Sequence, residues 1–201
     1  MRLSPILRPS RPISPTRSKR SRMASPCRMW STRNDNIEAA MHHGQLLHLL
    51  DTKVAAEWLD YNGHMNDAAY AIVFSRSIDT LMDRIHLDAA ARKATGYTIY
   101  TMQAMLHYVK EAKHDAPLTV RAHLLEHDAK RIRIWLEMTE GLGGAKLAMS
   151  EQLLLSVDQS DGVRVAPWLP ETAAALDALA KAQGGLAHPE EAGRGIALKR
   201  R

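Results

Sequence analysis

The sequence predicts an α+β fold in which five antiparallel strands curl around one long central helix, followed by a C-terminal helix. Three observations indicate this fold. A single helical stripe of apolar residues lies between residues 70 and 85. The segments after residue 96 instead alternate apolar and polar residues, as strands with one face in a core do. A lone helix of that length needs a curved sheet around it to bury its apolar surface.

The predicted fold begins with an extended segment over residues 46–59, followed by a polar run over 60–66. Asn66 is a good N-cap for the helix that comes next. The helical stripe consists of Tyr70, Phe74, Ile78, Leu81, Met82 and Ile85. We expect Ala69, Ile72 and Val73 to widen this stripe, so that the first half of the helix is buried on most sides.

The strands follow in order along the chain. The first is predicted over residues 97–110, and Gly141–Gly144 makes a hairpin turn further on. The alternating apolar faces of the next three strands are Leu118, Val120, Ala122 and Leu124; Ile132, Ile134, Leu136 and Met138; and Leu147, Met149, Leu153, Leu155 and Val157. The predicted domain therefore spans residues 46–170, and residues 171–201 form a helix and a polar tail.

Composition excludes several classes of protein. The chain has 201 residues, a hydrophobic content of 45% and a mean hydropathy of −0.30. No segment approaches the roughly 20 apolar residues of a membrane-spanning helix. One cysteine excludes an intrachain disulfide framework and a cysteine-based zinc site, and it fits a reducing compartment. We therefore expect a cytoplasmic protein.

The net charge of +5 is unevenly distributed. Residues 1–34 contain nine Lys or Arg and no acid, whereas the remainder has 18 basic and 22 acidic residues. The Arg/Ser/Pro-rich segment 1–34 is predicted to be disordered. One alternative is a transit peptide, although the five prolines of the segment oppose the amphipathic helix that such a peptide needs. The other is an arm that binds nucleic acid, although Trp30 is the only aromatic residue of the segment. We favour upstream sequence before a later start, and we expect neither a nucleic-acid nor a membrane partner.

The polar run and the first helical turn resemble a family signature. The residues are Asp60-Tyr61-Asn62-Gly63-His64-Met65-Asn66-Asp67-Ala68-Ala69-Tyr70. They match the pattern Asp-x-x-Gly-His-x-Asn-x-x-x-Tyr of acyl-CoA thioesterases of the 4-hydroxybenzoyl-CoA thioesterase type. The resemblance implies the hotdog fold, a homodimer or dimer of dimers, an acyl-CoA substrate, and no cofactor, since coenzyme A is part of the substrate.

A closer likeness runs from about residue 50 to residue 170 and includes the segments 96–101, 127–131 and 150–152. It resembles the betainyl-CoA thioesterases, which occur alone or fused behind an L-carnitine dehydrogenase. The resemblance implies hydrolysis of betainyl-CoA in carnitine degradation. The chain contains no Gly-x-Gly-x-x-Gly fingerprint of a dehydrogenase. A general short- or medium-chain acyl-CoA thioesterase and a non-catalytic hotdog binding module are the alternatives, and the intact run from Asp60 to Asn66 argues against the second.

Thioester hydrolysis needs a base or nucleophile and donors for the developing oxyanion. Asp60 can supply the first, either attacking the carbonyl or activating a water. The helix N-terminus offers unpaired N–H groups and a positive dipole end. By resemblance, the oxyanion donor is the backbone N–H of Asp67. We expect Gly63 to allow close approach of the backbone.

Three further residues carry open alternatives. Asn66 caps the helix and could also orient Asp60. His64 is interpreted as structural, with a direct catalytic role as the alternative. Glu151 interrupts an apolar strand face, which either a β-bulge or a carboxylate in the active cleft would explain.

A trimethylammonium acyl group requires aromatic faces. Trp135 is the first candidate, because its strand's alternation places it opposite the core-facing side chains, where a partner subunit could complete a cleft. Further candidates on the predicted strands are Tyr97, Tyr100 and Tyr108.

Two other groups of side chains bear on ligand binding. Coenzyme A phosphates could be held by Lys130, Arg131 and Arg133, which are equally typical of a solvated strand face. No metal site is predicted, because the spacing of His123 and His127 does not converge on a strand.

Overall fold

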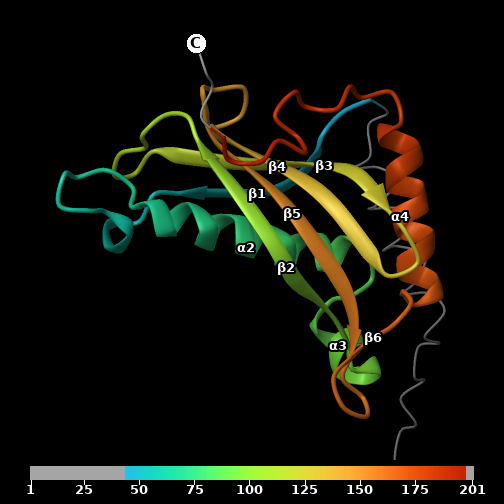
Figure 1. Cartoon of the computed structure of the whole chain (residues 1–201). Helices are drawn as coiled ribbons and strands as arrows, with labels where there is room; N and C mark the ends of the chain where they lie inside the picture. The colour runs from blue at the N-terminus through green and yellow to red at the C-terminus, as the bar shows by residue number, and fades with distance from the viewer. Residues whose placement is uncertain (1–43, 198–201) are drawn as a thin grey trace, which may run out of the picture.

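A curled antiparallel sheet wraps around one long helix in the computed structural model, which describes residues 44–197 (Figure 1). The prediction for residues 1–34 therefore lies outside the described residues. The strands are β1 (Leu47–Lys53), β2 (Tyr97–Tyr108), β3 (Pro117–His127), β4 (Arg131–Glu140), β5 (Lys146–Asp158) and β6 (Arg164–Val165). The spatial order is β1-β3-β4-β5-β2, and the short β6 pairs with β5. The predicted α+β architecture is confirmed, with β1 and β2 at the two edges.

Helix α2 (Asp67–Arg84) lies on the concave side of the sheet and forms the centre of the core (Figure 1). The Asn66 side chain caps it by accepting a hydrogen bond from Ala68 N at 2.9 Å. Phe74 and Leu81 are fully buried, as the apolar stripe predicts. Ile72 is 43% exposed, so the prediction that it widens the buried stripe is wrong. Ile72 is two residues from both Tyr70 and Phe74, which is about half a helical turn, so its side chain points away from the sheet.

Two short helical elements were not predicted. A 3-10 turn, η1 (Ala56–Trp58), interrupts the segment that the sequence predicts as extended. Helix α3 (Ala89–Thr95) connects α2 to β2 and ends at Gly96, whose φ is +75°. A Cβ at Gly96 would lie 2.8 Å from Ser160 N, so both backbone conformation and space require glycine there.

The strand β5 presents a different face to the core than predicted. Its register pairs Leu154, Gln152 and Ser150 with the core residues Ile132, Ile134 and Leu136 of β4. Leu153, Leu155 and Met149 therefore lie on the outer face, away from α2, and the predicted apolar face is wrong. A register shift next to Leu147 explains the error, because Leu147 joins the core out of phase with the rest of the strand.

Helix α4 (Pro170–Gln183) packs its residues Leu176 and Leu179 into the main core. The chain that follows this helix crosses the outer face of the sheet (Figure 1). There it covers a second apolar cluster formed by Leu125, Trp135 and Met149. Both faces of the central strands are therefore buried.

Candidate active site

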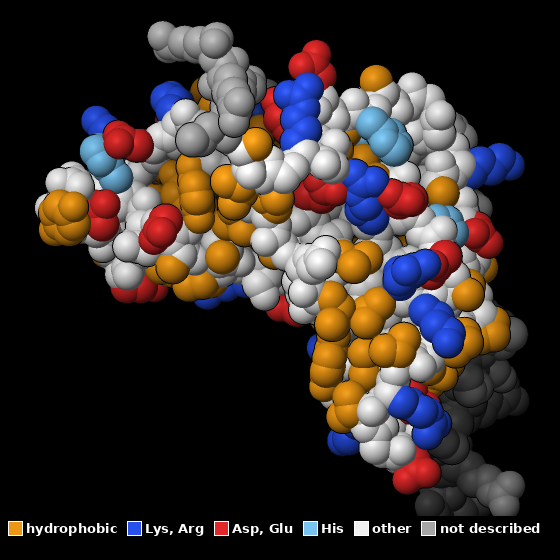
Figure 2. All heavy atoms as spheres, viewed as in Figure 1, with side chains coloured by type: hydrophobic (Ala, Val, Ile, Leu, Met, Phe, Trp, Pro, Cys, Tyr) orange, Lys and Arg blue, Asp and Glu red, His pale blue; other side chains and the backbone are white. Residues whose placement is uncertain are grey.

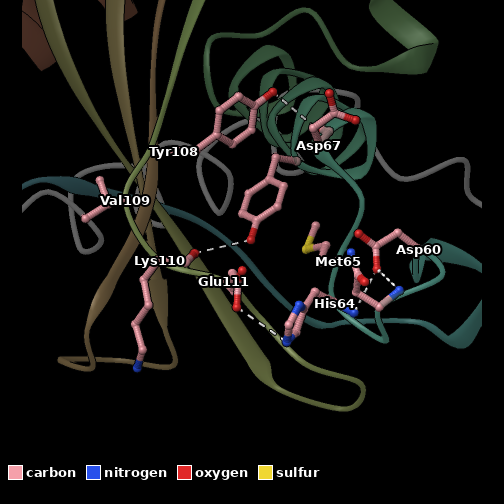
Figure 3. Close-up of a pocket in the computed structure, with 10 residues that line it drawn as sticks. Asp60, His64, Met65, Asp67, Tyr108, Val109, Lys110 and Glu111 are labelled. Carbon is pink, nitrogen blue, oxygen red and sulfur yellow. Dashed lines mark hydrogen bonds and ion pairs between the residues drawn. The ribbon is translucent and has the colours of Figure 1, made fainter.

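A pocket of about 320 Å³ opens where the loop before α2, the first turn of α2 and the end of β2 meet (Figure 3). The pocket is lined by Asp60, Asn62, His64, Met65, Asp67, Tyr70, Tyr108, Val109, Lys110 and Glu111. Four of the predicted site residues, Asp60, His64, Asp67 and Tyr108, come together here.

Asp60 is held by the loop that it begins. Its backbone N–H donates to His64 O at 2.8 Å, and its Oδ1 accepts from His64 N at 3.1 Å and Asn62 N at 2.8 Å. These hydrogen bonds hold the pKa of Asp60 below its ordinary value of 3.8, and the bond from His64 N has the largest effect. The carboxylate is therefore ionised at neutral pH. Both backbone hydrogen bonds go to Oδ1, and the side chain of Asn62 is a further hydrogen-bond partner of the carboxylate.

Gly63 serves this loop in another way than expected. A Cβ there would meet no atom within 4 Å, so close approach of the backbone does not require glycine. Its φ of +76° is the reason for glycine, because other residues rarely adopt this left-handed conformation. The conformation lets Gly63 N donate to Asp60 O at 3.1 Å, which closes the turn.

The N-terminus of α2 presents one free donor to the pocket. Asn66 occupies the next two N–H groups, since its Oδ1 accepts from Ala68 N and its backbone O accepts from Ala69 N. No acceptor within the described chain binds the N–H of Asp67. Asn66 makes no hydrogen bond to Asp60 among these residues, so the geometry gives it the capping role alone. An anionic oxygen beside the Asp67 N–H would also be favoured by the helix dipole.

His64 links the loop to the chain that follows β2. Its Nε2 lies 3.4 Å from Glu111 Oε2 (Figure 3). Beside it, Met65 N donates to Ala112 O at 2.8 Å. An isolated bridge also pairs His64 with Lys113. These contacts fix the position of the loop that carries Asp60.

Two tyrosines form the aromatic part of the pocket. The rings of Tyr70 and Tyr108 are edge-to-face with centroids 5.4 Å apart. Tyr70 OH donates to Lys110 O and Tyr108 OH donates to Asp67 O, both at 3.3 Å. Burial raises the pKa of both hydroxyls, and nearby carboxylates raise them further, Glu111 for Tyr70 and Asp67 for Tyr108. Both tyrosines are therefore neutral at physiological pH.

Sequence reasoning missed six residues that line the pocket, namely Asn62, Met65, Tyr70, Val109, Lys110 and Glu111. Tyr70 is the last residue of the signature, so the motif itself offered a signal for it. Nothing local marks Lys110 and Glu111, because they reach the pocket only through the pairing of the loop with the chain after β2.

The other predicted binding residues lie elsewhere in the chain. The strand register places Tyr108 opposite Ala148 but Arg131 opposite Leu155, so the ends of the sheet separate them. Lys130 and Arg131 lie at the far hairpin, where Arg131 pairs with Asp128 at 2.5 Å. Tyr97 and Tyr100 also lie at that end, on the first residues of β2.

The outer face of the sheet holds the remaining predicted residues. Trp135 lies on the predicted side of its strand but is only 1% exposed, so no substrate reaches its ring in this structure. Glu151 binds Arg133 Nε at 2.5 Å, and Arg133 also pairs with Glu126. Glu151 therefore does not face the pocket, and Arg133 is occupied by two carboxylates.

Within residues 44–197, no group of three or more His, Cys, Asp or Glu side chains could hold a metal ion. Among the helices of the same range, none combines the length and apolar character that crossing a membrane requires.

Comparison with known sequences shows the family to which the chain belongs. The model of the thioesterase-like superfamily matches residues 54–176. A betainyl-CoA thioesterase of Pseudomonas aeruginosa is 44% identical over 154 residues, which cover 77% of this chain and 96% of the relative. A Rhizobium meliloti L-carnitine dehydrogenase/betainyl-CoA thioesterase is 36% identical over 154 residues, which are 77% of this chain and 31% of that longer protein.

Solved structures lead to the same family. The crystal structure of a Pseudomonas putida protein proposed to be a thioesterase superposes with a TM-score of 0.67 at 34% identity, covering 78% of this chain and 99% of that one. A Staphylococcus aureus protein solved in complex with CoA gives a TM-score of 0.70 at 25% identity, covering 79% and 98%. The chain belongs to the thioesterase-like superfamily and is an acyl-CoA thioesterase with the hotdog fold.

Proposed function

We propose that this thioesterase hydrolyses betainyl-CoA, with Asp60 acting on the thioester carbonyl and the Asp67 N–H binding its oxygen. One observation carries the catalytic part. An ionised carboxylate and a helix N-terminal N–H that has no acceptor within residues 44–197 line the same pocket. In one route Asp60 activates a water molecule that attacks the carbonyl and displaces the thiolate of coenzyme A. In the other route Asp60 itself attacks the carbonyl and displaces the thiolate, and water then hydrolyses the acyl intermediate formed on Asp60. The products are the free acid and the thiol of coenzyme A.

The charge of the pocket supports a cationic acyl group. It is lined by the carboxylates of Asp60, Asp67 and Glu111, whereas Lys110 is paired with Glu140 at 3.2 Å. Tyr108 is 54% exposed and offers an aromatic face beside these carboxylates. A trimethylammonium group is stabilised by an aromatic face, so Tyr108, rather than the covered Trp135, is the proposed cation partner. The substrate named for the Pseudomonas aeruginosa relative agrees with this chemistry.

The edge strand β2 supports a homodimer. The run from Tyr100 to Ala104 is exposed, and Met102 on it is 55% exposed. Figure 2 shows hydrophobic side chains gathered over the region of β2. An unpaired strand edge is a template for a second copy, and two-fold pairing would place the start of one β2 beside the end of the other. The partner's Tyr97 would then approach the pocket that holds Tyr108. A dimer of dimers is the alternative, and the proposed location is the cytoplasm.

The decisive experiment compares betainyl-CoA with its neutral isostere 3,3-dimethylbutanoyl-CoA, following release of the thiol with a colorimetric reagent. A cation over an aromatic face contributes about 0.5–2 kcal/mol, so kcat/KM should favour betainyl-CoA by roughly 2- to 30-fold. Equal values for the two substrates would leave a general acyl-CoA thioesterase. No hydrolysis of any acyl-CoA would leave a binding module and refute the catalytic proposal as well.

A further inference from the structure

The outer face of the sheet carries an apolar cluster that is separate from the main core. It consists of Leu125, Trp135 and Met149, which are 8%, 1% and 4% exposed. These residues come from three neighbouring strands, β3, β4 and β5. On an open sheet this face would meet water, so the low exposure of Trp135 requires a cover.

The cover is the chain that follows α4, residues 184–197, which we name the C-terminal segment. Its His188 ring lies edge-on to the ring of His123 on β3, with centroids 5.6 Å apart. Ala192 packs against the apolar cluster, and Gly193 N donates to Glu151 Oε2 on β5 at 2.7 Å. Successive residues of the segment therefore cross three strands, as Figure 1 shows on the side of the sheet opposite α2.

Both ends of this crossing are anchored. At the start, the side chain of Gln183 is 3% exposed, accepts from Leu124 N at 2.8 Å and donates to Ala122 O at 2.9 Å. At the far end, Glu151 binds Gly193 N with one oxygen and Arg133 Nε with the other. Hydrogen bonds to a charged group are stronger than those between neutral groups. This contact gives Glu151 a structural role that its place on the strand alone does not reveal.

We infer that the C-terminal segment is an intramolecular cover that keeps the outer faces of two copies of this protein from stacking on each other. Without it, the three apolar side chains would form one contiguous patch across the centre of the sheet. Contiguous exposed apolar surface marks association sites, and a second copy offers the same patch for an isologous contact. Covalent attachment gives the segment a high effective concentration, so it outcompetes a second copy. The inference is independent of the substrate and of the β2 contact.

The test measures the mass in solution by light scattering. Truncation after Leu186 keeps α4 and Gln183 but removes the contacts of His188, Ala192 and Gly193. We expect the truncated chain to assemble to about twice the mass of the full chain. An unchanged mass after truncation would overturn the inference.

Two variants keep the test decisive if the truncated chain aggregates. Adding Trp135→Gln to the truncated chain should restore the mass of the full chain, and continued association in this variant would show that another surface is responsible. In the full-length chain, Gly193→Pro removes the N–H donor and cannot adopt a φ of +76°. It should produce a population of doubled mass, whereas Ile196→Ser, at a residue that is 97% exposed, should not. Equal masses for these two full-length variants would contradict the inference.

Discussion

Replacing Asp60 by Asn tests the catalytic proposal with little expected disturbance of the loop. Asn keeps an oxygen at the position of Oδ1, so the hydrogen bonds from Asn62 N and His64 N can persist. What is lost is the negative charge, and with it both nucleophilic attack and general-base activation of water. General acid–base catalysis typically contributes 10²- to 10⁴-fold, so we expect kcat/KM to fall by about that factor.

The assay follows thiol release from betainyl-CoA, with thermal unfolding as the measure of stability. Asp83→Asn, on the exposed side of the last turn of α2, is the matched control and should leave both quantities unchanged. Activity of Asp60→Asn within about threefold of the wild type corresponds to a barrier change below roughly 1 kcal/mol. That result would refute the assignment of Asp60.

The pH profile of the wild type provides a second check on Asp60. A carboxylate whose pKa lies below 3.8 stays ionised throughout the range from pH 7 to pH 5. Protonation of Asp60 should therefore not reduce kcat/KM over this range. An acid limb near pH 6 that disappears in the Asp60→Asn variant would contradict the low pKa of Asp60.

Three further predictions concern single side chains. Tyr108→Leu should abolish the preference for betainyl-CoA over its neutral isostere while Tyr108→Phe keeps it; equal preferences in both variants would move the cation site elsewhere. Gln183→Leu leaves Leu124 N and Ala122 O without partners and should lower the free energy of unfolding by about 2–4 kcal/mol, measured by urea denaturation. Burial, and then His188, lower the pKa of His123, so its unfolded state binds more protons. The stability that this group contributes is complete above pH 6.5 and is lost as the pH falls below it, and His123→Gln should flatten this dependence in unfolding curves recorded between pH 5 and pH 8.

The helix and the strands β3 and β4 were predictable because the face that each turns to the main core is apolar and its opposite face is mainly polar. The stripe from Tyr70 to Ile85 has one periodicity and one partner, the concave sheet. Likewise, Ile132 and Ile134 alternate with residues on the opposite face. In these elements the local pattern and the tertiary environment agree, so the pattern is sufficient.

The strand β5 was not predictable by the same reasoning. Its outer face is covered by the C-terminal segment, so Met149 is buried there, while Leu154 is buried against the helix side. Alternation cannot distinguish two buried faces, and the register shift beside Leu147 then breaks the phase. No pattern in the sequence indicates that the residues after α4 return to cover this strand.

The residues of the candidate site also fall into two groups, those that a local pattern predicts and those that long-range contacts place. The signature predicted Asp60 and the Asp67 N–H because they lie in one continuous run whose local hydrogen bonds shape it. Glu111 and Lys110 reach the pocket through contacts between segments far apart in the chain, in which Met65 N binds Ala112 O and Lys110 N binds Leu147 O. Pairing of this kind depends on the finished sheet, and no local pattern encodes it.

Strand β2 links the active site to the surface on which the proposed dimer forms. The loop that carries Asp60 is fixed to the chain that follows β2, and β2 also supplies Tyr108 and the exposed edge on which the proposed dimer is built. A second copy that pairs with this edge would stiffen the strand whose end positions the loop and the aromatic ring. Catalysis and assembly are therefore expected to depend on one structural element. The outer face, closed by the C-terminal segment, stands apart from it, so changes there should alter assembly without displacing Asp60.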